Sequence, residues 1–178
     1  PWARRAGEYF AAAFAFDTAA QWFRHALAWS PAPSDTRLLL AEALVRASRG
    51  TEAGREYARR ADEDASSAPQ HLQKAAECFL AAGALADGMG VLQPLLSRSG
   101  IAWPNDPRRV MLGMFVDLGV VAWRSRGTRR APATAERVLE TDLCWSAAKG
   151  LLGIDPVRGA AFALAGLRRI LGSADRAR

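Results

Sequence analysis

The stretch AGEYFAAAFAFDTAAQWFRHALAWSP, residues 6 to 31, combines helix-favouring residues with small and aromatic side chains at regular intervals. Alternation of apolar and polar residues, the signature of a half-buried strand, is almost absent here and in the rest of the 178 residues. The sequence therefore predicts an all-α protein of about nine helices. To within a few residues, the expected helices span 2–15, 18–30, 35–49, 51–65, 69–83, 85–98, 106–125, 133–153 and 156–172.

The side-chain pattern of this stretch recurs along the chain. Small residues, where two helices would cross, and large apolar residues, which would fill the space between them, return 34 residues later and then 35 residues later again. The three sets are Gly7, Phe10, Ala19 and Phe23; Ala41, Leu44, Ala53 and Tyr57; and Ala76, Phe79, Gly88 and Leu92.

With Pro31 closing the first copy, the pattern resembles the tetratricopeptide repeat, a helix-turn-helix unit of about 34 residues. The resemblance implies three antiparallel hairpins over residues 1–100, stacked as a right-handed α-solenoid, followed by longer, divergent helices over 101–178. We expect a single helical-repeat domain over residues 1–178. Because the sequence begins and ends in helix-favouring composition, we also expect it to be a segment of a longer chain.

The aromatic residues divide into two groups. Those at helical spacing, Phe14 among them, are expected to fill a core that one hairpin cannot close alone. Trp2, Trp22 and Trp29 lie off the repeat positions. They would either pack against a further hairpin on the N-terminal side or line a concave peptide-binding face, so Trp22 and Trp29 are candidate interaction residues.

Two residues mark expected helix ends in the first repeats. Asp17 is placed to cap a helix by accepting a hydrogen bond from a backbone N–H. Gly50 stands where a helix-ending residue in the left-handed conformation is expected.

A different pattern occupies residues 140–162, ETDLCWSAAKGLLGIDPVRGAAF. Across roughly residues 70–170, the order of an alanine-rich pair of helices, a basic helix and this stretch resembles the helical region of large bacterial serine/threonine protein kinases. In those proteins a kinase domain precedes an expected AAA-type signalling ATPase and tetratricopeptide-like repeats. The shared positions are Asp142, Cys144, Trp145, Ser146, Gly150, Leu151, Asp155, Arg158, Gly159, Ala160 and Phe162.

Most of these residues have a structural interpretation. Asp155 followed by Pro156 is a favourable helix start, with the carboxylate accepting from first-turn amides and proline at the first helical position. Gly159 would allow two helix backbones to approach closely. Trp145 and Leu151, with Phe162 from the next helix, are expected to supply the contact across the hairpin.

Cys144 could also be read as a nucleophile, which would need a nearby base. His25 and His71 are the histidines of the sequence, and both lie in the early repeats. We therefore interpret Cys144 as structural and expect Asp142 to form an ion pair with Arg158 across the hairpin.

The formal net charge is +6, and Lys74 and Lys149 are the only lysines among 24 basic residues. Enrichment in arginine, alanine and glycine is what a GC-rich genome encodes irrespective of function. Basic surfaces also attract phosphate. The densest group of arginines occurs in WRSRGTRR at 123–130, which we interpret as a solvated loop and keep as a candidate interaction surface; its members are Arg124, Arg126, Arg129 and Arg130.

Motif searches find no P-loop, dinucleotide fingerprint, kinase motif, zinc-protease motif or nucleophile elbow. The two cysteines have no metal-ligand spacing, and no apolar run is long enough to cross a membrane. We expect a cytoplasmic, non-catalytic segment with no cofactor, no metal and no membrane partner, which binds protein or peptide, including attached kinase and ATPase domains. The alternative is a nucleic-acid-associated helical module of a signalling-ATPase transcription regulator.

Overall fold

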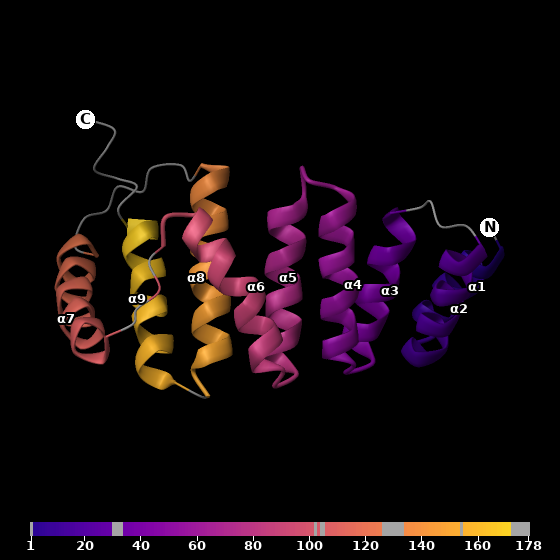
Figure 1. The fold of residues 1–178 in the computed structure, drawn as a ribbon, viewed down its shortest axis with the longest axis horizontal. Coiled ribbons are helices and arrows are strands. Elements are labelled where there is room, and N and C mark those ends of the chain that lie inside the picture. The colour runs from indigo at the N-terminus through magenta and orange to yellow at the C-terminus, as the bar shows by residue number, and fades with distance from the viewer. Residues whose placement is uncertain are drawn as a thin grey trace. The chain divides into compact units, whose positions relative to one another are not determined.

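The computed structural model describes residues 2–29, 34–101, 103, 106–125, 134–153 and 155–171. Within these residues the chain forms nine helices and no strand, which confirms the predicted all-α class (Figure 1). In chain order the helices are α1 (Trp2–Ala12), α2 (Phe16–Trp29), α3 (Ser34–Arg46), α4 (Gly50–Glu63), α5 (Ala68–Ala81), α6 (Leu85–Arg98), α7 (Pro107–Arg124), α8 (Ala135–Leu151) and α9 (Pro156–Leu171).

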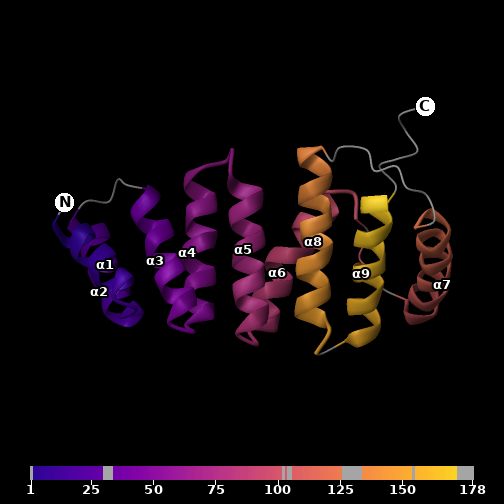
Figure 2. The same ribbon diagram turned by 180° about the vertical axis from the view of Figure 1, so that it is seen from behind.

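The helices belong to two compact units, Pro1–Val91 and Leu92–Arg178, with the boundary inside α6. The expectation of a single domain stays a prediction. In the first unit, each of the helices α1 to α4 packs against the helix that follows it in the chain. Helices α2, α3, α4 and α5 therefore lie side by side in the order of the sequence (Figures 1 and 2). Turns of three residues join α1 to α2, α3 to α4 and α5 to α6, so the two helices of each pair run in opposite directions.

The three short turns share one hydrogen-bond pattern. Each contains a residue with positive φ, and the residue after it donates its N–H to the carbonyl five residues earlier, which closes the preceding helix. The positive-φ residues are Phe14 (60°), Ser48 (60°) and Gly83 (76°). The three hydrogen bonds run from Ala15 to Phe10, from Arg49 to Leu44 and from Ala84 to Phe79, each with an N···O distance of 2.9 Å. The carbonyls therefore belong to equivalent positions of the pattern read from the sequence.

The core of the first unit lies at the repeated positions. Phe10 is half-buried, and the other repeated positions of this unit are buried. These buried residues are Gly7, Ala19, Phe23, Ala41, Leu44, Ala53, Tyr57, Ala76, Phe79 and Gly88. Leu92, at the start of the second unit, is buried as well. Pro31 lies outside the described residues.

Phe14 and Gly50 differ from their expected roles. Phe14 is 79% exposed, because it occupies the left-handed position of the first turn and its side chain leaves the helical face that forms the core. Gly50 does not end a helix: Ser48 takes the left-handed conformation, and Gly50 begins α4. A Cβ atom at Gly50 would lie 2.9 Å from the carbonyl oxygen of Cys78, so glycine permits a close approach to α5. Asp17 lies in the first turn of α2, which begins one residue earlier.

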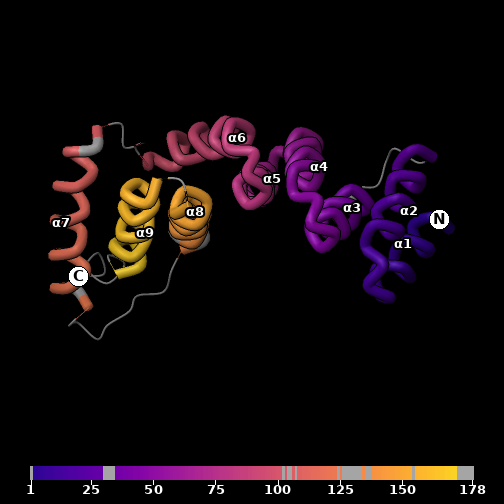
Figure 3. Tube along the Cα trace, turned by 90° about the horizontal axis from the view of Figure 1, so that it is seen from below, coloured from indigo at the N-terminus to yellow at the C-terminus, as the bar shows by residue number. Residues whose placement is uncertain are grey.

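In the second unit, α9 packs against both α7 and α8 and lies between them (Figure 3). The face of α8 that packs inward consists of small and apolar side chains at helical spacing. Its buried residues include Leu143, Cys144, Ala147, Ala148 and Leu151. No helix formed by the described residues is long and apolar enough to cross a membrane.

Candidate functional site

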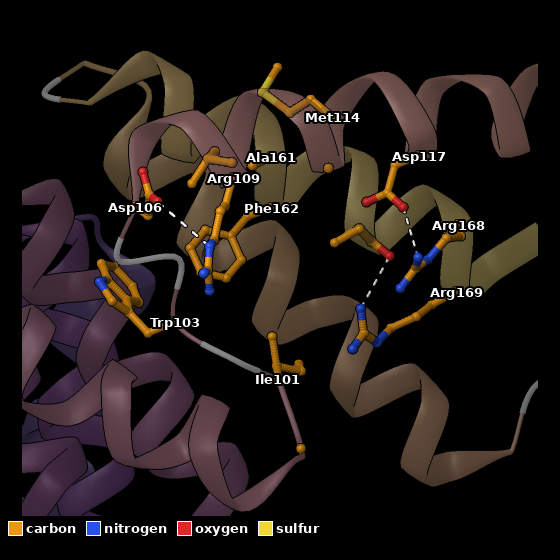
Figure 4. A pocket seen from close by; sticks show the side chains of 14 residues that line it. Ile101, Trp103, Asp106, Arg109, Met114, Asp117, Ala161, Phe162, Arg168 and Arg169 are labelled. Carbon is orange, nitrogen blue, oxygen red and sulfur yellow. Dashed lines mark hydrogen bonds and ion pairs between the residues drawn. The ribbon is translucent and has the colours of Figure 1, made fainter.

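The second unit contains an open pocket of about 540 Å³, bordered by α7, α9 and the residues that lead into α7 (Figure 4). The lining residues are Gly100, Ile101, Trp103, Asp106, Arg109, Val110, Gly113, Met114, Asp117, Ala161, Phe162, Ala165, Arg168 and Arg169. The lining residues of α7 occupy positions 109, 110, 113, 114 and 117, and this alternation of one-residue and three-residue steps keeps them on one face of that helix.

The inner part of this pocket is apolar. Ile101, Val110 and Phe162 are each buried, at 3 to 6% exposure. The indole ring of Trp103 contacts the Phe162 ring, with centroids 5.4 Å apart and planes inclined by 44°. The Arg158 guanidinium carbon lies 6.0 Å from the centre of the Trp103 ring, within the range of a cation–π interaction.

Charged side chains surround the apolar part. Asp117 on α7 and Arg168 on α9 point toward one another and form an ion pair of 2.8 Å (Figure 4). Asp106 pairs with Arg109 at 3.6 Å, and the Arg109 side chain is 90% exposed. Arg169 donates to the carboxylate of Glu140 at 3.1 Å, which links α9 to α8.

These pairs decide what the pocket can bind. Each of the three arginines of the lining is already paired with a carboxylate, and the adjoining surface is apolar. A ligand with an apolar group beside an anionic group would match both parts, although it would have to compete with the existing carboxylates. Among the described residues, the lining has no cysteine, histidine, serine or lysine, and there is no cluster of three or more potential metal ligands.

Asp155 caps α9 as the sequence predicts. Its Oδ1 accepts a hydrogen bond from the backbone N–H of Arg158 at 3.0 Å, and its Oδ2 accepts from the Arg158 guanidinium at 2.8 Å. Gly159 also fulfils its prediction, because a Cβ atom there would lie 3.1 Å from the backbone of Leu152. Arg158 thus forms an ion pair with the cap of its own helix, and the expected pair with Asp142 across the hairpin stays a prediction.

The expected burial of Trp145 is wrong. Its side chain is 58% exposed, because the inward face of α8 passes through positions 143, 144, 147, 148 and 151 and leaves position 145 outside. Phe162 is buried as predicted, but its aromatic neighbour is Trp103. This contact joins residues distant in sequence, and spacing alone gives no signal for it.

Cys144 is fully buried in the α8–α9 contact. Burial raises the pKa of its thiol, and so does the charge of Glu140, whereas Arg169 acts in the opposite direction. The reactive thiolate is thus disfavoured at neutral pH, consistent with a structural role. Ser146 is buried beside it and donates its hydroxyl to the carbonyl oxygen of Asp142 at 2.7 Å.

A second surface of interest lies on α1 and α2 of the first unit. The ring of Trp2 contacts the rings of Trp22 and Trp29, with centroid distances of 5.4 and 5.1 Å. The ring of His25 lies 5.9 Å from that of Trp22 and 5.9 Å from that of Trp29. Trp22 is half-buried, whereas Trp29 is 62% exposed. We call these four residues the aromatic cluster. The sequence identified its tryptophans but not His25, which shares their face of α2 at a spacing of three and four residues.

The basic stretch at 123–130 is mostly outside the described residues. Arg126, Arg129 and Arg130 are not described, nor is the side chain of Arg124. Their role as a candidate interaction surface stays a prediction. Arg168 and Asp117, which meet at the pocket, had no sequence signal beyond being charged residues on helices.

Comparison with protein-family models, with curated proteins and with solved structures finds no significant match to this chain. The described residues form an all-α protein with an open pocket, lined by apolar side chains and arginine–carboxylate pairs, and with an exposed aromatic cluster.

Proposed function

We propose that this chain is a non-catalytic helical-repeat scaffold that binds protein or peptide. In this proposal the helices of the first unit are tetratricopeptide-like hairpins of a right-handed α-solenoid. The supporting observation is the recurrence of the helix-ending turn at Phe14, Ser48 and Gly83, with spacings that match the side-chain repeat. Repetition of side chains and of backbone hydrogen bonds at the same period is expected of stacked hairpins.

The larger setting that we propose is a multidomain bacterial serine/threonine kinase with an ATPase module. The support is the resemblance carried by DLCWS at 142–146 and DPVRGAAF at 155–162. In such a protein the segment would bind a cytoplasmic partner or relay a signal to the attached domains, without a cofactor or metal of its own. The capped start at Asp155 and the close approach at Gly159 give these motif residues a structural purpose.

The aromatic cluster is the surface that we assign to peptide binding. Exposed tryptophans provide large contact areas at low conformational cost and are enriched at interaction hot spots. Trp29 is suited to this role because its ring is exposed and held by contacts with Trp2 and His25.

Peptide selection on the immobilised protein tests the proposal. We expect enriched peptides whose binding is weakened by Trp29→Ala and unchanged by Tyr9→Ala, which alters another exposed aromatic residue of the same unit. Phosphotransfer or ATP hydrolysis by the purified segment would contradict the non-catalytic role. A salt-dependent shift of DNA in a gel, with no peptide selected, would favour the nucleic-acid-associated module instead.

A further inference from the structure

Helix α7 is apolar on two opposite faces. One face, which includes Val110 and Met114, turns toward α9 and the pocket. The other face carries six large apolar side chains that are each more than half exposed. We call these six residues the outer face of α7: Met111, Leu112, Phe115, Val116, Leu118 and Trp123.

The outer face is unusual for a surface helix. Amphipathic helices bury one apolar stripe and expose a polar one, and a helix that is apolar all round is normally covered on all sides. Phe115, Leu112 and Trp123 are each 68% exposed. Six such side chains form a patch on the order of 500 Å², near the upper end of what a monomeric protein leaves uncovered.

Basic side chains outnumber acidic ones at the N-terminal end of this face. Asp117 is the only acidic residue of α7, and it is turned away from the outer face into its ion pair with Arg168. Arg108, exposed at the N-terminal end of the helix, lies on the helical face shared by Leu112 and Phe115. Arg109, beside it, has a side chain that is 90% exposed. Asp106, the residue that caps the helix, pairs with Arg109 at 3.6 Å, so the two arginines leave this end of the patch with a net positive charge among the described residues.

Gly119 adds a feature of shape. It lies on the outer face between Phe115 and Trp123, one turn from each, and a Cβ atom there would meet no other atom within 4 Å. The exposed rings of Phe115 and Trp123 thus border a shallow depression at Gly119. A side chain from a neighbouring helix would fit into this depression, as in the knobs-into-holes packing of helices.

From this apolarity, charge and shape we propose that the outer face of α7 docks a partner helix that presents a leucine-rich stripe and carries acidic residues at the end that meets Arg108 and Arg109. The inference rests on the proposed scaffold function and names the partner chemistry of a second surface. A second copy of the chain fits less well. Antiparallel pairing of two α7 helices offers Arg108 no acidic residue, because Asp117, the acidic residue of α7, is held in its ion pair with Arg168.

Fluorescence anisotropy with two synthetic helical peptides provides the test. Both peptides carry the same leucine stripe, and one has glutamates where the other has lysines at the end that would meet Arg108. We expect the glutamate peptide to bind at least about tenfold more tightly than the lysine peptide. The double variant Arg108→Glu/Arg109→Glu should reverse this preference, because only the sign of the charge changes.

Phe115→Glu should weaken binding of both peptides by more than about tenfold. Trp145→Glu, on an exposed position of α8, is the matched control and should leave binding unchanged. Circular dichroism of each variant verifies that the helices persist. Equal binding of the two peptides, no binding, or no effect of Phe115→Glu would overturn the inference.

Three further outcomes separate the alternatives. A dimer in sedimentation that Phe115→Glu dissociates would show that a second copy covers this face, and anionic vesicles that bind the wild type but not Phe115→Glu would show a membrane contact. Either result overturns the proposal. Peptides selected through Trp29, together with no binding of either synthetic helical peptide, would leave the scaffold function standing and remove only the inference about α7.

Discussion

Gly7 in α1 lies directly against the ring of Phe23 in α2: a Cβ atom at position 7 would stand 2.6 Å from Phe23 Cε1. Phe23 is 1% exposed and surrounded by core residues, so its ring has little room to move. The first hairpin therefore depends on the absence of a side chain at one position and the presence of a large ring at another.

Replacing Gly7 by alanine should destabilise the protein by about 1–3 kcal/mol, because the added methyl group overpacks this contact. Gly90 in α6 is the control. It is exposed and has no atom within 4 Å of a built Cβ, so Gly90→Ala should stabilise by about 0.5–1 kcal/mol through helix propensity. Urea midpoints of the two variants measure the difference, and equal shifts would contradict the packing argument.

At the left-handed turn positions, introducing a glycine should raise the stability of the protein and removing one should lower it. Ser48→Gly should stabilise the protein by about 1 kcal/mol, because serine is strained at a φ of 60°. Gly83→Ala should destabilise it by a similar amount, although a Cβ at Gly83 would meet no atom within 4 Å. Thermal unfolding of both variants tests the effect, which is purely conformational.

Removal of the cap on α9 should be measurable. Asp155→Ala should cost about 0.5–2 kcal/mol, because the N–H of Arg158 loses its acceptor. Asp155→Ser preserves a capping hydroxyl and should cost less. A urea midpoint unchanged by Asp155→Ala would show that the cap contributes nothing to the stability of the second unit.

Trp145 and Phe162 should differ strongly when truncated. Phe162 is 3% exposed and contacts Trp103, so Phe162→Ala should cost about 3–5 kcal/mol. Trp145→Ala should change stability by no more than about 0.5 kcal/mol, as is usual for exposed positions. A large loss on Trp145→Ala would place that ring in an interface.

Alkaline pH should destabilise the first unit through Cys78. Burial raises the pKa of its thiol from 9.0 to about 11, and the charge of Glu77 contributes further. The folded state therefore retains a proton that the unfolded chain releases, so stability is full below pH 9 and is lost as pH rises toward 11. Urea midpoints between pH 8 and 11 should fall less steeply for Cys78→Ala than for the wild type.

The sequence by itself determined the helices, their approximate bounds and the buried repeat positions of the first unit. Periodic apolar residues and short breaks are local properties, and they suffice because each helix must bury the stripe that its own sequence supplies. The same reasoning found the cap at Asp155 and the close approach at Gly159, since both depend on neighbours within one hairpin.

Tertiary structure alone decided which side chains meet across helices and which remain uncovered. Asp117 pairs with Arg168, and Trp103 contacts Phe162. The residues of each pair are far apart in the sequence, at a distance that matches neither a helical spacing nor the repeat length. The expected burial of Phe14 and Trp145 is wrong because Phe14 lies in a left-handed turn and Trp145 lies off the face of α8 that packs inward. The outer face of α7 became recognisable only when α9 was seen to cover one apolar side of that helix and to leave the other exposed. The amino-acid composition of a helix shows how apolar it is, but the packing of neighbouring helices determines how much of its apolar surface remains exposed to solvent.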